Sequence, residues 1–227
     1  MIRVLLVDDE AITREILRDY VGSDPSLEIV GEAANGQVAV AQASALRPDV
    51  ILMDMQMPIM DGVRATAQIH AEFPEIAILG LSTFSTDRYV VDLLRAGASG
   101  YLVKDALPND IVAAVHAVAA GESVLSPDVT RHVVRGLEES TPATLEPDEA
   151  LMSVLTEKEL EVIALLADGL SNREMAQHLF VTESTIKARF VKIMEKLGVR
   201  DRVQILVTAI ARGLVTITDD PHFRPRE

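Results

Sequence analysis

Short apolar runs alternate with helix-like stretches over the first 120 residues of the chain. The runs have the length of buried strands, and the stretches between them repeat apolar residues every three or four positions, as helices with one buried face do. The apolar runs are Val4–Val7, Ile29–Ala33, Val50–Met53, Ile76–Leu81 and Gly100–Val103. The helical stretches contain Ile12–Val21, Val38–Leu46, Val63–Ile69, Tyr89–Leu94 and Ile111–Val118.

Five repeats of strand then helix predict a doubly wound α/β domain, in which helices cover both faces of a five-stranded parallel sheet. Pro108 supports the start of the last helix, because proline is well tolerated in a first helical turn. Ligands of such folds bind at the carboxyl ends of the strands, where the strand order reverses. The residues that follow each strand are therefore the first candidates for a site.

From Leu155 onward the pattern is helical, and capping residues divide it into four segments. Thr156, with Glu159 three residues later, forms a capping box at the start of the first. The predicted helices run to about Ala167, to near Leu179, from Glu183 to Leu197, and to near Arg212, and their caps are Thr156, Ser171 or Asn172, Thr182 and Asp201. The second domain is therefore predicted to be all-α.

A segment of different composition separates the two domains. It contains a short predicted helix from Ser126 to Arg135, followed by an acidic stretch with two prolines and no apolar period. Such a stretch is typical of a flexible linker. The predicted organisation is a first domain at 1–120, a short helix and linker at 121–149, a second domain at 150–214 and a tail at 215–227.

Charge is distributed unevenly along the chain, and this changes the expectation for the second domain. The formal net charge is −14, which by itself argues against a nucleic-acid partner. Residues 171–202, however, hold seven basic and four acidic residues. Double-stranded DNA is therefore a candidate partner of this helical segment.

Composition excludes several other classes of function. Cysteine is absent, so disulfides, zinc–thiolate sites and thiol catalysis are excluded. No apolar run approaches the roughly 20 residues that a membrane-spanning helix needs. The N-terminal apolar run turns acidic at Asp8, unlike a signal peptide. These features predict a cytoplasmic protein with no membrane partner.

Polar side chains follow four of the five predicted strands: Asp8 and Asp9 the first, Asp54 the third, Ser82 the fourth and Lys104 the fifth. Three carboxylates at one edge of a sheet repel and need a cation, and an all-oxygen ligand set favours Mg²⁺. A phosphoryl group on Asp54 would find a metal, a hydroxyl and an ammonium group around it, as phosphoryl transfer requires. Each residue alone is more typical of a turn, a cap or a solvated surface, but their joint placement favours a site.

Four stretches of the first domain match a known pattern: Val7–Glu10, Asp54–Gly62, Leu81–Ser82 and Gly97–Lys104. With them, residues 1–120 resemble the receiver domain of a two-component response regulator. The resemblance implies that Asp54 accepts a phosphoryl group from a sensor histidine kinase. It also implies that Mg²⁺ is held by Asp9, Asp54 and the backbone carbonyl of Gln56, with Asp8 in support. Ser82 and Lys104 would bind the phosphoryl oxygens, and Tyr101 would be an aromatic residue that reorients with Ser82.

Only Phe180–Thr182 separates the second and third predicted helices of the second domain, which is helix-turn-helix spacing. The third helix has an apolar side and several basic residues on its other faces. A solvated basic face is the commoner meaning of such a pattern, but basic side chains on this helix also suit the phosphates and base edges of the major groove. The candidate DNA contacts are Arg173, Thr185, Lys187, Ala188, Arg189, Lys192 and Lys196.

The wider pattern of the second domain decides between these readings. The stretches Leu155–Ile163, Gly169–Ala176, Thr185–Lys187 and Lys196–Arg202 closely resemble the LuxR-type four-helix DNA-binding domain. Receiver plus this domain is the arrangement of the NarL/FixJ class of response regulators. The family pattern is not followed at Glu157, Leu160 and Arg189, and only Arg189 lies on the recognition helix. The resemblance implies DNA contacts by Lys187 and Lys192 and pairing of two protomers through the last helix, for which the candidate residues are Asp201, Arg202, Ile205, Leu206 and Ala209.

The resulting hypothesis is a phosphorylation-controlled transcription factor that does not turn over an external substrate. Phosphorylation would shift an existing equilibrium toward a homodimer that binds two half-sites on DNA. One alternative is a regulator whose receiver only scaffolds the dimer, but Asp8, Asp9 and Lys104 are all retained. The other is a Mg²⁺-dependent phosphohydrolase that uses Asp54, but neither a substrate-binding cap nor a general-acid carboxylate is evident.

Overall fold

The computed structural model describes residues 1–82, 87–122, 124 and 148–215. The chain divides into two compact units, Met1–Val124 and Leu125–Glu227. The predicted helix from Ser126 to Arg135, nearly all of the predicted linker and the tail beyond Val215 lie outside the described residues.

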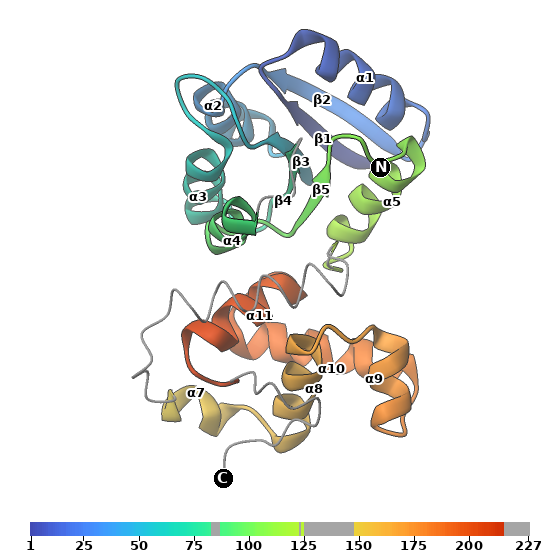
Figure 1. Cartoon of the computed structure of the whole chain (residues 1–227), viewed down its shortest axis with the longest axis vertical. Helices are drawn as coiled ribbons and strands as arrows, with labels where there is room; N and C mark the ends of the chain where they lie inside the picture. The colour runs from blue at the N-terminus through green and yellow to red at the C-terminus, as the bar shows by residue number, and fades with distance from the viewer. Residues whose placement is uncertain (83–86, 123, 125–147, 216–227) are drawn as a thin grey trace. The chain divides into compact units, whose positions relative to one another are not determined.

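The first unit is the predicted doubly wound domain (Figure 1). Its strands are β1 (Ile2–Val7), β2 (Leu27–Ala33), β3 (Val50–Asp54), β4 (Ala77–Ser82) and β5 (Gly100–Val103). All pairings are parallel, and the strand order is β2-β1-β3-β4-β5. Its helices are α1 (Ala11–Gly22), α2 (Gly36–Leu46), α3 (Gly62–Glu72), α4 (Asp87–Arg95) and α5 (Pro108–Ala119). Each predicted strand and helix of this unit is present.

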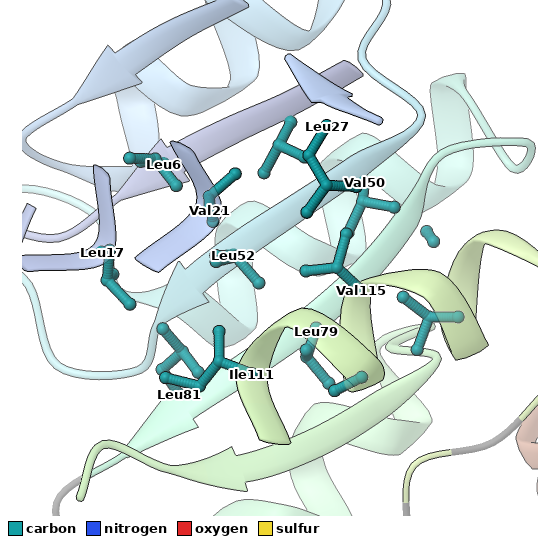
Figure 2. Close-up of a cluster of buried hydrophobic side chains, with 14 residues drawn as sticks. Leu6, Leu17, Val21, Leu27, Val50, Leu52, Leu79, Leu81, Ile111 and Val115 are labelled. Atoms are coloured by element: carbon teal, nitrogen blue, oxygen red, sulfur yellow. The ribbon is translucent and has the colours of Figure 1, made fainter. Parts of the chain in front are cut away.

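The sheet is buried on both faces, because successive residues of a strand point to opposite sides. Leu6 and Leu52 pack on one side with Ile111 of α5 and with residues of α1 (Figure 2). Leu5 points to the other side, where Ile69 of α3 packs with residues of α2. Figure 1 shows α1 and α5 together on one side of the sheet and α2, α3 and α4 on the other. The continuous apolar strands predicted this two-sided burial.

Register brings the polar strand ends together. Val7 of β1 lies opposite Met53 of β3, so Asp8, which follows β1, and Asp54, the last residue of β3, lie side by side at the edge of the sheet. The order of the strands reverses between β1 and β3, which is where a doubly wound sheet opens a crevice for ligands. On the other side of β3, Ser82 of β4 lies opposite Val103 of β5, directly before Lys104.

The second unit is helical, as predicted. Its described helices are α7 (Glu149–Val154), α8 (Glu157–Ala167), α9 (Asn172–His178), α10 (Glu183–Leu197) and α11 (Arg202–Ala211). The predicted caps are present: the side chains of Ser171, Thr182 and Asp201 each accept a hydrogen bond from a backbone N–H in the first turn of their helix. Over the described ranges, no helix is long and apolar enough to cross a membrane.

The prediction was wrong at the start of this unit, where Asp148 and Glu149 were placed in the linker. Asp148 instead caps α7 by accepting a hydrogen bond from the Leu151 N–H at 3.0 Å. Its carboxylate also pairs with Arg212 at 3.2 Å, and its N–H donates to the Arg212 carbonyl at 3.1 Å. A helix of six residues is too short to show a period, and the contact with the end of α11 that fixes it is distant in sequence.

Candidate functional site

Three carboxylates lie together at the carboxyl edge of the sheet. One carboxylate oxygen from each of Asp8, Asp9 and Asp54 lies within 4.8 Å of the other two. Asp8 and Asp54 are buried, whereas Asp9 is exposed. Two of these groups are therefore held close together with little water to screen their repulsion, and a compensating positive charge is required.

Lys104 supplies part of that charge. Its Nζ atom lies 2.6 Å from Asp8 Oδ2 and 2.9 Å from Asp54 Oδ1. Burial alone would lower the pKa of Lys104, but its hydrogen bonds and charge interactions with both carboxylates outweigh burial and raise the pKa. Burial raises the pKa of Asp54, with Asp8 adding to the effect, although Lys104 and the Gln56 backbone N–H stabilise its charged form. Three carboxylates around one ammonium group leave a surplus of negative charge, which a divalent cation would neutralise.

Backbone hydrogen bonds fix the positions of these side chains. The Asp8 N–H donates to the Ala33 carbonyl of β2 at 3.1 Å, and the Lys104 N–H donates to the Ser82 carbonyl of β4 at 2.8 Å. The loop after β3 is held against α3, because the Gly62 N–H donates to the Met55 carbonyl at 3.1 Å. The site therefore stands on neighbouring strands rather than on free loops.

Ser82 and Tyr101 lie next to one another beside the carboxylates. Burial raises the pKa of the Tyr101 hydroxyl, and a hydrogen bond with the Ser82 side chain partly opposes that rise. The Tyr101 side chain is buried, and Ser82, at the end of β4, is partly exposed. The structure thus places Asp8, Asp9, Asp54 and Lys104 together and Ser82 beside Tyr101, and it shows the backbone N–H of Gln56, rather than its predicted carbonyl, in contact with Asp54.

Sequence reasoning missed Arg14 of α1 at this site. Arg14 Nη1 donates to the Asp8 carbonyl at 2.7 Å, and Arg14 Nε donates to Glu32 Oε2 at 3.2 Å. Arg18, one turn later, also binds Glu32. An arginine pair spaced at i, i+4 is common on solvated helix faces, so the pattern alone gave no reason to single out Arg14.

In the second unit, the predicted DNA-contacting residues form an exposed surface on α9 and α10. Arg173, Lys187, Ala188 and Lys192 are exposed, and Thr185 is partly exposed beside its cap Thr182. The opposite side of α10 is buried through Ile186, Phe190 and Ile193. The helix therefore presents a polar, basic face, as a recognition helix must.

One of the basic residues forms an ion pair within the domain, and another is partly buried. Lys196 Nζ lies 2.5 Å from Glu159 Oε2, which also accepts a hydrogen bond from the Thr156 N–H at 2.8 Å. Arg189 is only partly exposed, and its Nη1 atom is buried. The Lys196 ammonium therefore links the end of α10 to the start of α8, and its charge is already paired.

Four of the five residues selected for pairing of protomers lie in the interior of the domain, so their selection was wrong. Ile205 and Ala209 are fully buried, Leu206 is 1% exposed, and Asp201 is a buried cap of α11. Arg202 is partly exposed, and its guanidinium lies 5.0 Å from the centre of the Phe190 ring. The apolar pattern of this helix marked its core side, and nothing in the pattern distinguishes that side from an interface.

Comparisons with known protein families match both units. The family described as "Response regulator receiver domain" matches residues 4–116. The family described as "Bacterial regulatory proteins, luxR family" matches residues 153–209.

Two of the similar proteins align with nearly the whole chain, and a similar solved structure aligns with part of it. The uncharacterized transcriptional regulatory protein YxjL of Bacillus subtilis is 38% identical over 214 residues, which cover 94% of this chain and 97% of YxjL. The response regulator protein VraR of Staphylococcus aureus is 37% identical, with 94% and 99% covered. A crystal structure of a LuxR-family two-component response regulator from an Aurantimonas species is 31% identical with a TM-score of 0.56, covering 60% of this chain and 96% of that one.

Proposed function

This chain belongs to the two-component response regulators that join a receiver domain to a LuxR-type DNA-binding domain, and on that premise we propose that Asp54 is its phosphoacceptor. The observation that carries the proposal is the pair of short contacts from Lys104 to Asp8 and Asp54 at the edge where β1 and β3 meet. A buried carboxylate with an ammonium group, a hydroxyl and two further carboxylates around it has what phosphoryl transfer requires.

The residues present fit a bound Mg²⁺ ion. Asp8, Asp9 and Asp54 offer only oxygen ligands, and Lys104 leaves their negative charge incompletely neutralised. The proposed ligands are Asp9, Asp54 and the Gln56 carbonyl, with Asp8 in support. When bound, the ion would neutralise charge that develops on the phosphoryl oxygens.

The transfer itself is carried out by side chains already in place. An Asp54 carboxylate oxygen forms a bond to phosphorus as the P–N bond of a phosphohistidine breaks, and the donor imidazole leaves with the electron pair. Lys104 then pairs with a phosphoryl oxygen in place of Asp54 Oδ1, and the Ser82 hydroxyl donates to another. Because Ser82 now faces the phosphoryl group, its hydrogen bond with Tyr101 is lost and Tyr101 reorients.

A groove of about 570 Å³ gives a phosphodonor access to this edge. Asp9, Gln56, Arg64 of α3 and Asp92 of α4 are among the residues that line it. Apolar residues are also exposed on α1 at Ile12 and directly before α5 at Leu107, each three positions after a site residue in the sequence. We propose that a sensor histidine kinase contacts these two residues when it docks.

For the second domain, we propose that α10 enters the major groove of double-stranded DNA. Lys187 and Lys192 are exposed on it, and Arg173 is exposed on the neighbouring helix. A homodimer would use the outer side of α11, where Val207 and Thr208 are partly exposed and Ala211 is exposed. Such a dimer reads two half-sites separated by about 10 base pairs or a multiple of that spacing.

The test begins with intact mass after incubation with Mg²⁺ and a small phosphodonor. The wild type gains the mass of one phosphoryl group, and Asp54→Ala or added EDTA abolishes the gain. DNA binding and oligomeric state are then compared with and without the modification. Absence of any mass gain with several donors would leave a receiver that only scaffolds the protein.

A further inference from the structure

Arg14 joins the acidic edge of the receiver to the neighbouring strand. Its guanidinium donates from Nη1 to the Asp8 carbonyl at 2.7 Å and from Nε to Glu32 Oε2 at 3.2 Å. Glu32 lies near the end of β2, one residue before Ala33, whose carbonyl accepts the Asp8 N–H. Both backbone polar groups of Asp8 are thus tied to β2, the N–H directly and the carbonyl through Arg14.

The orientation of the Asp8 carbonyl affects the orientation of Asp9. It belongs to the planar peptide unit that also contains the Asp9 N–H and leads to the Asp9 Cα atom. Fixing this carbonyl therefore fixes the direction in which Asp9 leaves the strand. The Asp8 carboxylate is oriented in the same turn, because its Oδ1 atom accepts a hydrogen bond from the Glu10 N–H at 2.9 Å.

Stability of α1 alone does not explain an arginine at this position. Arg14 is the fourth residue of the helix, where a positive charge opposes the helix dipole by up to about 1 kcal/mol. The helix start also lacks a side-chain cap from Glu10 and has no acidic residue in its first turn. A cation next to a site of surplus negative charge could act by charge alone, but its donors are directed at the Asp8 carbonyl and Glu32.

We propose that Arg14 is a positioning residue for the metal-binding turn: it orients the Asp8–Asp9 peptide through the Asp8 carbonyl and is itself held by Glu32. The proposal rests on the proposed phosphoacceptor site in so far as that turn binds Mg²⁺. A planar guanidinium can serve the carbonyl and the carboxylate at the same time from different nitrogens, which one ammonium group does less well.

Arg18 provides a matched control on the same helix. It binds the same carboxylate, with Arg18 Nε 2.9 Å from Glu32 Oε1, but the Asp8 carbonyl is held by Arg14. Arg14→Met and Arg18→Met each remove one positive charge from this side of the receiver. Charge alone predicts that both changes strengthen binding of a cation, whereas positioning predicts that only Arg14→Met weakens it.

The experiment measures the Mg²⁺ dissociation constant of the full chain by titration calorimetry. We expect Arg14→Met to raise it about tenfold, as loss of groups that orient metal ligands does. We expect Arg18→Met to leave it within about twofold and Arg14→Lys to give an intermediate value. An unchanged or lower dissociation constant for Arg14→Met, or an equal rise for Arg18→Met, would overturn the proposal.

A second readout needs neither metal nor phosphoryl transfer. In EDTA, hydrogen exchange at the Glu10 amide reports the turn directly, since that N–H is bonded to Asp8. Arg14→Met accelerates this exchange severalfold, and Arg18→Met does not. If wild type binds no Mg²⁺, the proposed function fails, while this exchange still decides whether Arg14 holds the turn; equal exchange in the two variants rejects that role.

Discussion

Replacing Lys196 with methionine tests whether this residue contacts DNA, as the sequence predicts, or stabilises its own domain. In the structure, Lys196 Nζ lies 2.5 Å from Glu159 Oε2. The Glu159 side chain is 6% exposed and also accepts the Thr156 N–H that begins α8. Methionine keeps most of the length of the side chain and removes the charge, so Glu159 loses its charged partner without a large change in packing.

The loss of folding stability in Lys196→Met depends on the Glu159 carboxylate, which no longer has a charged partner. Burial tends to raise the pKa of Glu159, but the bonds from Lys196 and Thr156 outweigh it and lower the pKa below 4.5. Without Lys196, Glu159 must stay charged in a buried place or bind a proton. Protonation at pH 7 costs about 1.4 kcal/mol for each pH unit above the ordinary pKa of 4.5, which limits the penalty on the carboxylate left behind to about 3 kcal/mol. We expect a loss of about 2–3 kcal/mol.

The pH dependence has a definite sign. Because the pKa of Glu159 is lowered in the folded protein, its ion pair stabilises the domain fully above about pH 4.5, and this contribution is lost as pH falls through the lowered pKa. The difference in stability between wild type and Lys196→Met therefore shrinks as the pH falls from 7 through 4.5 and below.

Hydrogen exchange of α8 and α10 amides in the full chain measures this difference, after correction for the intrinsic rate at each pH. Lys192→Met, which removes an exposed lysine from the same helix, is the control and leaves protection unchanged. Salt titrations of DNA binding complete the test, since loss of a phosphate contact lowers the salt slope by about one. A lower slope with unchanged protection for Lys196→Met would refute the structural role and restore the DNA contact.

Three further predictions concern the receiver and the helix-turn-helix. Lys104→Met leaves buried carboxylates at Asp8 and Asp54 without their ammonium partner, so in EDTA the free energy of unfolding of the receiver falls by about 3 kcal/mol, and Mg²⁺ restores part of it. Hydrogen exchange of β3 and β5 amides with and without Mg²⁺ checks this. Gly62→Ala would place a Cβ 2.1 Å from the Asp54 carbonyl oxygen, and we expect a loss of about 2 kcal/mol or more together with slower phosphorylation, measured by thermal unfolding and intact mass. Phe180 has a φ of +53° and is 96% exposed in the turn before α10, so Phe180→Gly should stabilise the second domain by about 0.5–1 kcal/mol; a lower melting temperature would contradict this account of strain.

The amino-acid pattern was enough to predict the order and kind of nearly all the elements. Continuous apolar runs indicated strands buried on both faces, and the period of the stretches between them indicated covering helices. The acidic site could be predicted because register in a parallel sheet is regular: residues that end neighbouring strands, such as Asp8 and Asp54, meet at one edge. The caps at Ser171, Thr182 and Asp201 could also be predicted, since capping depends on residues only three positions apart.

The partner of each polar or apolar group, in contrast, became known from the folded chain. The pattern of α11 marked Ile205 and Ala209 as apolar, but only packing shows that they face the core of their own domain rather than a second protomer. Lys196 is typical of a DNA-binding face until Glu159, 37 positions away in sequence, is found beside it. Arg14 likewise can be assigned to the site only from its contacts with Glu32 of β2 and the Asp8 carbonyl. The period of apolar residues shows that one side of an element is buried. It does not show which distant segment covers that side, because such contacts form only when the whole chain folds.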